Sequence, residues 1–403
     1  MKPLRLQPLD YASAAGFLVY SSSVVITPVC LVILAGELAF GLAAGGFLEA
    51  LRGFMVFIVL FASGFAAARW GKVKALGGGS LLLGAGLLLY AAAPSYEVVL
   101  CAMALMGVGS GVVEGLINPL IQRMHPQDSG RYLNILNGFW SVGVLATALV
   151  AGELLTREMS WRPIVAVLGG MSVITGAAFL AMSRQAPTEQ SNSSGQMLRQ
   201  MLSIARLGRF WLYMAAMFFG GAAEGAYTFW SASFIQIEHD GLPRAGGIGT
   251  ASFSAGMILG RFGSGWFVGQ KRLRRLILAS AAAGFGASWL VPMIDGLLTL
   301  YAVLFVAGLT IACFWPSIQA YAADRLSVDA TALLILLSCA GIPGFAFASW
   351  VMGEIGEAAG LRWAFAMIPI FFVLLALSIG IDRWLDRRRA RPASPPGNQE
   401  DGV

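Results

Sequence analysis

The chain has 403 residues, of which 57% are hydrophobic and only 12% are charged. A soluble domain carries about 25% charged residues. Half that share of charged residues cannot cover the water-facing surface of a soluble protein of this size. The net charge of +6 does not indicate a nucleic-acid-binding protein, because the basic residues lie in short segments between apolar runs. The composition therefore predicts a protein that lies within the lipid bilayer.

Apolar runs that are long enough to cross about 30 Å of hydrocarbon follow one another along the chain. The first, near residues 11–34, is too long for the apolar core of a signal peptide, so we expect an uncleaved first span. About twelve transmembrane helices are expected, near residues 10–35, 43–68, 75–94, 97–122, 132–155, 161–183, 208–236, 245–269, 275–293, 296–322, 330–353 and 361–382.

A polar stretch separates the sixth run from the seventh, and its Pro, Ser and Asn content is typical of a loop. The fourth and tenth runs also resemble each other, with NPLIQ at residues 118–122 and WPSIQ at 315–319, as expected for duplicated transporter repeats. We therefore predict an all-α polytopic membrane protein of two pseudo-symmetric six-helix bundles. The expected parts are an N-terminal bundle (1–183), a cytoplasmic linker (184–209), a C-terminal bundle (210–382) and a disordered cytoplasmic tail (383–403).

The basic residues are unevenly shared between the two sides of this topology. If the N-terminus is cytoplasmic, the outside loops hold only Arg157, Arg162, Arg244 and Arg362, and the other basic residues near span ends are cytoplasmic. Positive charge favours the cytoplasmic side, so both termini are expected there, in a multi-pass protein of the cell (inner) membrane.

Several kinds of site are not indicated by the sequence. The four cysteines form no C-x-x-C pair, and the two histidines, His125 and His239, fall on opposite sides of the membrane. There is no G-x-S-x-G elbow and no Walker loop, so we expect no enzyme, no cofactor and no metal site. A transporter-like sensor is only a distant alternative, because neither the linker nor the tail is long enough to form a signalling domain.

The segment after the second run, GFAAARWGK at residues 64–72, resembles the G-x-x-x-D-R-x-G-R/K loop of the major facilitator superfamily, with Ala68 at the acidic position. A more degenerate form, GWFVGQKR, occupies residues 265–272. The resemblance implies two bundles with a cavity between them. It also makes Arg69, Gly71 and Lys72 candidate gating residues. Asp128 and Arg131, in the next cytoplasmic loop, are further candidate gating residues.

Two further segments, EGLINP at residues 114–119 and GRYLNILNGFWSVG at 130–143, are similar to the fucose–proton symporter family. That family has a functional glutamate and an Asn-Pro pair in its fourth helix, which here are Glu114, Asn118 and Pro119. Its first helix also carries an acidic residue, whereas residues 11–34 of this chain contain none.

Four ionisable residues lie inside predicted spans, where each requires a partner or a water-filled cavity: Arg52, Glu114, Glu224 and Arg261. Glu114 and Glu224 are candidate proton-coupling groups; the alternative is a structural ion pair or a hydrogen bond between helices. Arg261 is a candidate partner of Glu224. Arg52 follows Glu49 by three residues and can pair with it, or else either arginine binds a substrate carboxylate.

Amides and aromatic rings in the same spans suggest a polar cargo, because sugar sites combine hydrogen bonding with an aromatic face. In each case the alternative is an aromatic that anchors the membrane interface or fills a packing gap. The candidate substrate-binding residues are Asn118, Asn137, Trp140, Tyr227, Trp230, Glu224 and Trp315.

We therefore expect a monomeric alternating-access symporter of a sugar or similar small polar solute, with the proton as coupling ion in preference to sodium. The alternative is an exporter or an organic-anion transporter in which Arg52 or Arg261 binds a carboxylate.

Overall fold

The computed structural model describes residues 6–126, 129–183, 194–267, 270–328 and 330–389. Within these ranges the protein is all-α. The first half holds six long helices whose apolar side chains share one core: α1 (Pro8–Leu38), α2 (Leu42–Trp70), α3 (Lys72–Ala91), α4 (Tyr96–Met124), α5 (Ser129–Thr156) and α6 (Trp161–Met182).

The second half repeats this plan around a second core, with two of its spans divided. The tenth span consists of two helices because Pro316 has no N–H to donate to the carbonyl of Ala312, and the helix is interrupted at this point. The helices are α8 (Gly208–Glu238), α9 (Pro243–Phe267), α10 (Leu273–Leu290), α11 (Leu297–Ile311), α12 (Phe314–Arg325), α13 (Ala330–Ala359), α14 (Leu361–Ala366) and α15 (Ile368–Arg389).

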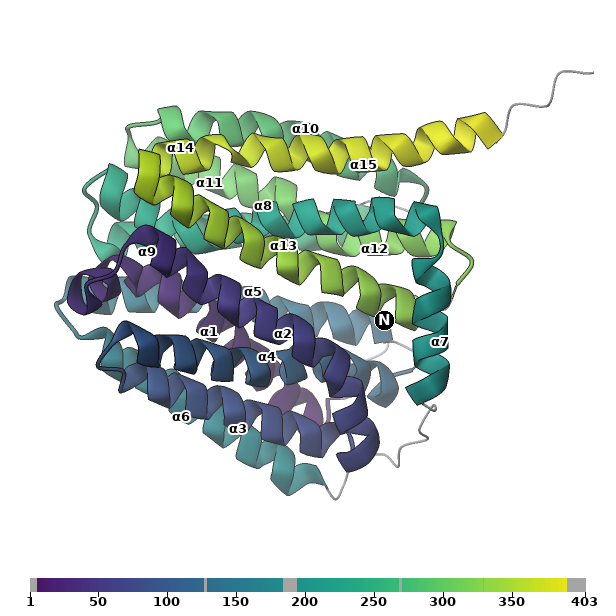
Figure 1. Ribbon diagram of the computed structural model, residues 1–403, viewed down its shortest axis with the longest axis horizontal. Coiled ribbons are helices and arrows are strands. Elements are labelled where there is room, and N and C mark those ends of the chain that lie inside the picture. The colour runs from purple at the N-terminus through teal and green to yellow at the C-terminus, as the bar shows by residue number, and fades with distance from the viewer. Residues whose placement is uncertain (1–5, 127–128, 184–193, 268–269, 329, 390–403) are drawn as a thin grey trace, which may run out of the picture.

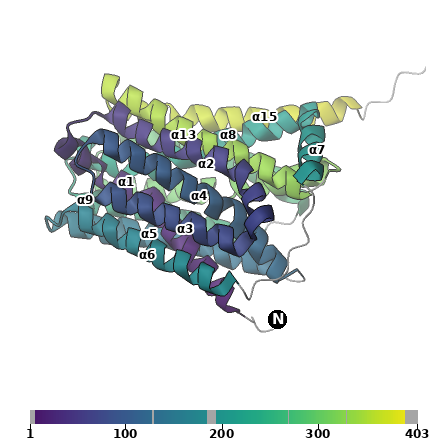
Figure 2. The ribbon, with the colours of Figure 1, turned by 60° about the horizontal axis from the view of Figure 1, so that its bottom comes forward.

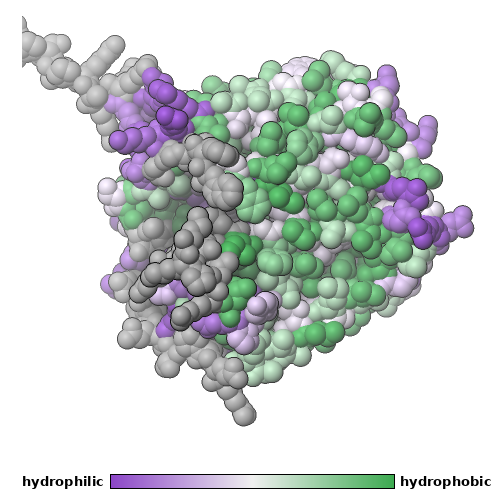
Figure 3. Space-filling view, turned by 180° about the vertical axis from the view of Figure 1, so that it is seen from behind, coloured by the Kyte–Doolittle hydropathy of each residue, from purple (hydrophilic) through white to green (hydrophobic). Residues whose placement is uncertain are grey.

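Ten helical segments of the described chain are long and apolar enough to cross a membrane. The other two long helices, α8 with 31 residues and α9 with 25, carry Glu224 and Arg261, which lower their hydropathy. Both run alongside the ten (Figure 1). An apolar belt covers the side of the molecule, with hydrophilic residues gathered at its two ends (Figure 3). The prediction of an all-α polytopic membrane protein of about twelve spans is confirmed.

The two ends of the molecule differ in how the halves meet. We call the end where α2 and α9 begin the gate end, and the opposite end, which carries α7 (Ser194–Ala205), the linker end. Between the halves α2 packs on α13, α5 on α9 and α1 on α8. At the gate end these contacts include backbone-to-backbone approaches, and Figure 1 shows this end at the left.

Two predicted segments differ from the structure. The linker, predicted as a loop, contains the helix α7, which lies across the ends of the spans (Figures 1 and 2). The tail was predicted to be disordered from residue 383, but α15 continues to Arg389. Its last turns are held by Asp386, which pairs with Arg209 and Arg325 at the linker end. The domain boundaries themselves remain a prediction.

Candidate functional site

A cluster of polar residues joins the two halves near the middle of the spans, and we call it the central cluster: Glu114, Trp140, Ser141, Glu224 and Arg261. Arg261 of α9 donates from Nη2 to Oε1 of Glu224 on α8 at 3.3 Å. Its Nη1 donates to Oγ of Ser141 on α5 at 3.1 Å. The same guanidinium lies 5.4 Å from the ring centroid of Trp140. One arginine of the second half therefore contacts two residues of the first.

Glu114, on α4, approaches this cluster from the first half. It lies within electrostatic range of both Glu224 and Arg261. Among the described residues, its carboxyl group forms no hydrogen bond or ion pair. Glu224 is 8% exposed and Glu114 is half-buried. The structure thus brings together three of the four ionisable residues predicted for the site, with Glu114 as the one that has no direct partner.

The fourth, Arg52, forms the ion pair with Glu49 that its spacing suggests. Both side chains are buried, at 4% and 2% exposure. Nη1 of Arg52 is buried and has no hydrogen-bond partner in the part of the chain that the structure describes. Tyr20 of α1 lies within electrostatic range of Arg52, Glu49 and Glu114, so this pair adjoins the central cluster.

The two asparagines lie on the first-half helices that supply the cluster. Oδ1 of Asn118, one turn after Glu114 on α4, is buried and accepts no hydrogen bond from any described residue. Asn137, one turn before Ser141 on α5, donates from Nδ2 to the carbonyl of Leu133 at 2.8 Å. An unpartnered amide oxygen beside an unpaired carboxyl is an arrangement that a hydroxyl-bearing molecule can satisfy.

Three other candidate aromatics pack within the second half. Tyr227 is fully buried and stacks on Phe253 at a centroid distance of 5.3 Å. Trp230 is fully buried and donates from Nε1 to the carbonyl of Ser349 at 2.9 Å. Trp315 packs its ring against the backbone of Gly341. In this structure these three rings pack against neighbouring residues, and Trp140 is the candidate aromatic that reaches the central cluster. A role for the three rings in substrate binding stays a prediction.

The candidate gating residues lie at the linker end. Arg69 is exposed in the last turn of α2, and Lys72 begins α3. Gly71 between them has a φ of +84°, a left-handed conformation that favours glycine and lets α2 pass directly into α3. Asp128 and the side chain of Arg131 lie outside the described residues.

Each half repeats, at the gate end, a clasp of ion-paired residues that was not predicted from the sequence. In the first half Glu37 pairs with Arg162, which also donates to the carbonyl of Ala93 at 2.9 Å. In the second half Glu238 pairs with Arg362 at 3.2 Å, and this arginine donates to the carbonyl of Pro292 at 3.2 Å. The clasp ties the first and sixth spans of each half to the loop after the third.

This repeat leaves a signal in the sequence. The two glutamates stand 201 positions apart, and the two arginines stand 200 apart. A comparison of the chain with itself at this shift would have pointed to all four residues.

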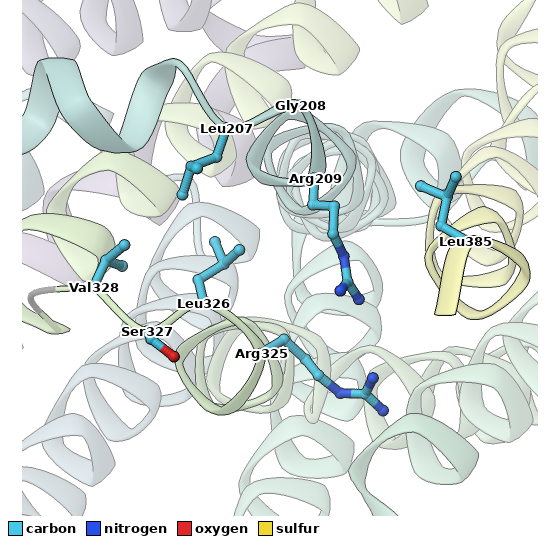
Figure 4. Close-up of a pocket in the computed structure, with 8 residues that line it drawn as sticks. All are labelled: Leu207, Gly208, Arg209, Arg325, Leu326, Ser327, Val328 and Leu385. Carbon is cyan, nitrogen blue, oxygen red and sulfur yellow. The ribbon is translucent and has the colours of Figure 1, made fainter. Parts of the chain in front are cut away.

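A cavity of about 500 Å³ opens at the linker end of the second half, lined by Leu207, Gly208, Arg209, Arg325, Leu326, Ser327, Val328 and Leu385 (Figure 4). Its arginines are already paired. Asp382, which is fully buried, accepts from Nε of Arg209 at 2.9 Å, from Tyr213 at 2.8 Å and from Tyr321 at 2.9 Å. This network ties α8, α12 and α15 together, and we assign it a structural role.

Comparisons with known proteins agree with the architecture. The sequence profile of the Major Facilitator Superfamily matches residues 12–324. No curated protein sequence matches the chain significantly. The profile match shows the superfamily but not the fucose–proton symporter family, so the resemblance to that family stays a prediction.

Two of the solved structures that share the fold illustrate it. The nucleoside transporter NupG is 15% identical, with a TM-score of 0.75, and the match covers 93% of this chain and 98% of that one. A bacterial homologue of the human lysosomal transporter Spinster, in an inward-facing and occupied conformation, is 14% identical, with a TM-score of 0.72 and coverage of 96% and 100%.

Proposed function

Because the chain belongs to the Major Facilitator Superfamily, we propose that it is a secondary active transporter that moves a small polar solute together with a proton by alternating access. A sugar is the class that the sequence favours, and the fold shared with a nucleoside transporter adds nucleosides to it. The cargo would be a neutral molecule that carries hydroxyl groups.

The observation that carries this proposal is the unpaired carboxyl group of Glu114 beside the Arg261–Glu224 pair. With Glu49 and Arg52, the region holds three acidic and two basic side chains. The ionised groups therefore sum to one negative charge, and a single proton neutralises it. An uncompensated charge in the low-dielectric interior is costly, so this site favours one proton as the coupling ion.

The geometry also suggests how the proton and the movement of the halves are linked. Glu114 and Glu224 are both within electrostatic range of Arg261, so an ionised Glu114 competes with Glu224 for the same guanidinium. Arg261 also holds Ser141 and lies over Trp140 in the first half. A change of its partner thus alters the contact between the halves, which is the coupling that alternating access needs.

The cargo would bind against the first-half side of this cluster. Glu114 and Oδ1 of Asn118 would accept hydrogen bonds from its hydroxyl groups, and the ring of Trp140 would pack on its apolar face. We further propose that the gate end faces outward and that the linker end, with both termini, faces the cytoplasm. In this orientation the structure is closed to the outside.

Transport into proteoliposomes tests the proposal. Sugars, nucleosides and carboxylates are first screened for thermal stabilisation of the purified protein, because a ligand that binds the folded state raises its melting temperature. We expect a neutral solute to stabilise the protein and to accumulate when the opposite side of the membrane is acidic. Accumulation that is indifferent to the pH gradient and to a protonophore would refute proton coupling.

A second candidate function is organic-anion transport. The observation in its favour is Nη1 of Arg52, which is buried and has no partner among the described side chains although Glu49 neutralises the guanidinium. A carboxylate cargo could accept this hydrogen bond. The same panel of solutes separates the two functions. Organic-anion transport requires that a carboxylate, and not a neutral sugar or nucleoside, stabilises the protein.

A further inference from the structure

The second helix of each half begins at the gate end without a capping side chain of its own. Gly41 is the N-cap of α2, and Leu242 precedes Pro243, the first residue of α9. Neither residue has a side-chain oxygen. The first N–H groups of a helix have no partner within the helix, so an acceptor must come from elsewhere.

In both cases the acceptor comes from the other half of the molecule. The N–H of Ala43 in α2 donates to Oε2 of Glu357 on α13 at 2.8 Å. The N–H of Arg244 in α9 donates to Oγ1 of Thr156 on α5 at 2.8 Å. Each half thus caps the second helix of its partner half.

The two caps are copies of one another. Ala43 and Arg244 are 201 positions apart, and so are Thr156 and Glu357. The central cluster is not repeated in this way, because the position 201 before Glu224 is Ser23. The two caps are therefore symmetric, whereas the central cluster is one-sided.

Close packing next to the caps shows the same shift of 201 positions. A Cβ atom at Gly46 would lie 2.5 Å from the carbonyl oxygen of Ser349, and one at Gly247 would lie 2.3 Å from that of Ala148. These glycines bring the backbones of the two halves into contact, which places each cap within reach of its helix.

We propose that Glu357 and Thr156 are gate residues, whose capping of the opposite half holds the gate end closed. Opening of this end separates α2 from α13 and α9 from α5, so both helix ends lose their acceptors together. The side chain of Arg244 adds a bidentate ion pair with Glu153, with distances of 2.5 and 3.0 Å, on one side of the gate. The caps therefore set the balance between the closed and open gate, independently of what the central cluster binds.

Removal of each acceptor tests this inference. Spin labels at Met159 of the first half and Leu298 of the second, both exposed near the gate end, report the distance between the halves in a chain whose four cysteines are replaced. We expect Glu357→Leu and Thr156→Val each to raise the ratio of open to closed gate by roughly threefold to tenfold. The double variant should show about the product of the two effects, because the two caps share no residue.

Two conservative variants serve as matched controls. Glu357→Gln and Thr156→Ser keep an acceptor oxygen at the same position, so their distance distributions should match the parent chain.

A second route displaces the cap without removing it. A Cβ at Gly41 would lie 2.2 Å from Oε2 of Glu357, so Gly41→Ala should open the gate, whereas Gly36→Ala, which meets nothing within 4 Å, should not.

Unchanged distances in both deletion variants and in Gly41→Ala would overturn the inference. Equal shifts in the deletion and the conservative variants would also overturn it, because the acceptor would then not be the cause. The distances are measured without substrate and at one pH. The outcome is therefore separate from the proposed proton coupling, and either can fail without the other.

Discussion

Replacement of Glu114 with glutamine separates proton coupling from transport itself. The amide keeps the size of the side chain and its ability to hydrogen-bond a solute, but it cannot release a proton. If one proton moves with each solute, every pH unit across the membrane supplies about 1.36 kcal/mol, which corresponds to about tenfold accumulation. One proton is the number that the proposed coupling uses, because Glu114 is the single carboxyl group of the central region without an ion-pair partner among the described residues.

The measurement is uptake into proteoliposomes with a gradient of one pH unit, together with exchange of labelled for unlabelled solute without a gradient. We expect wild-type protein to accumulate the solute about tenfold and Glu114→Gln to bring it only to equal concentration on both sides. Exchange should survive in the variant. Glu97→Gln is the matched control, because Glu97 is exposed in the first turn of the same helix.

Accumulation by Glu114→Gln at the level of the wild-type protein would refute the assignment of the proton to this residue. If Glu114→Gln abolished both exchange and accumulation, Glu114 would be required for transport itself. The charge argument would then fail as an account of coupling.

Three further variants address the central cluster and its support. Arg261→Gln leaves Glu224 without its cation, and we expect solute exchange to fall by about tenfold or more, as measured by initial rates. Trp140→Ala removes the ring beside the guanidinium and should raise the KM about tenfold, with a smaller effect for Trp140→Phe. Asp382→Asn weakens the buried network around Arg209, and thermal unfolding should show a loss of about 2–4 kcal/mol, or roughly 3–5 °C, with KM unchanged.

The sequence alone determined the membrane class, the number of spans and the division into two halves. These properties are local, because a run of apolar residues must cross the bilayer wherever its neighbours lie. It also determined that Glu114, Glu224 and Arg261 needed special surroundings, since the cost of an ionised group in the bilayer depends on its depth in its own span.

Only the tertiary structure decided which of the candidate side chains meet. Tyr227, Trp230 and Trp140 were all candidates in the sequence, yet the first two face the packed interior of the second half and Trp140 faces Arg261. The orientation of a helix about its own axis depends on what packs against it, and hydropathy is nearly uniform around a buried helix. The caps that Glu357 and Thr156 supply join residues more than 80 positions apart, so no local pattern could reveal them.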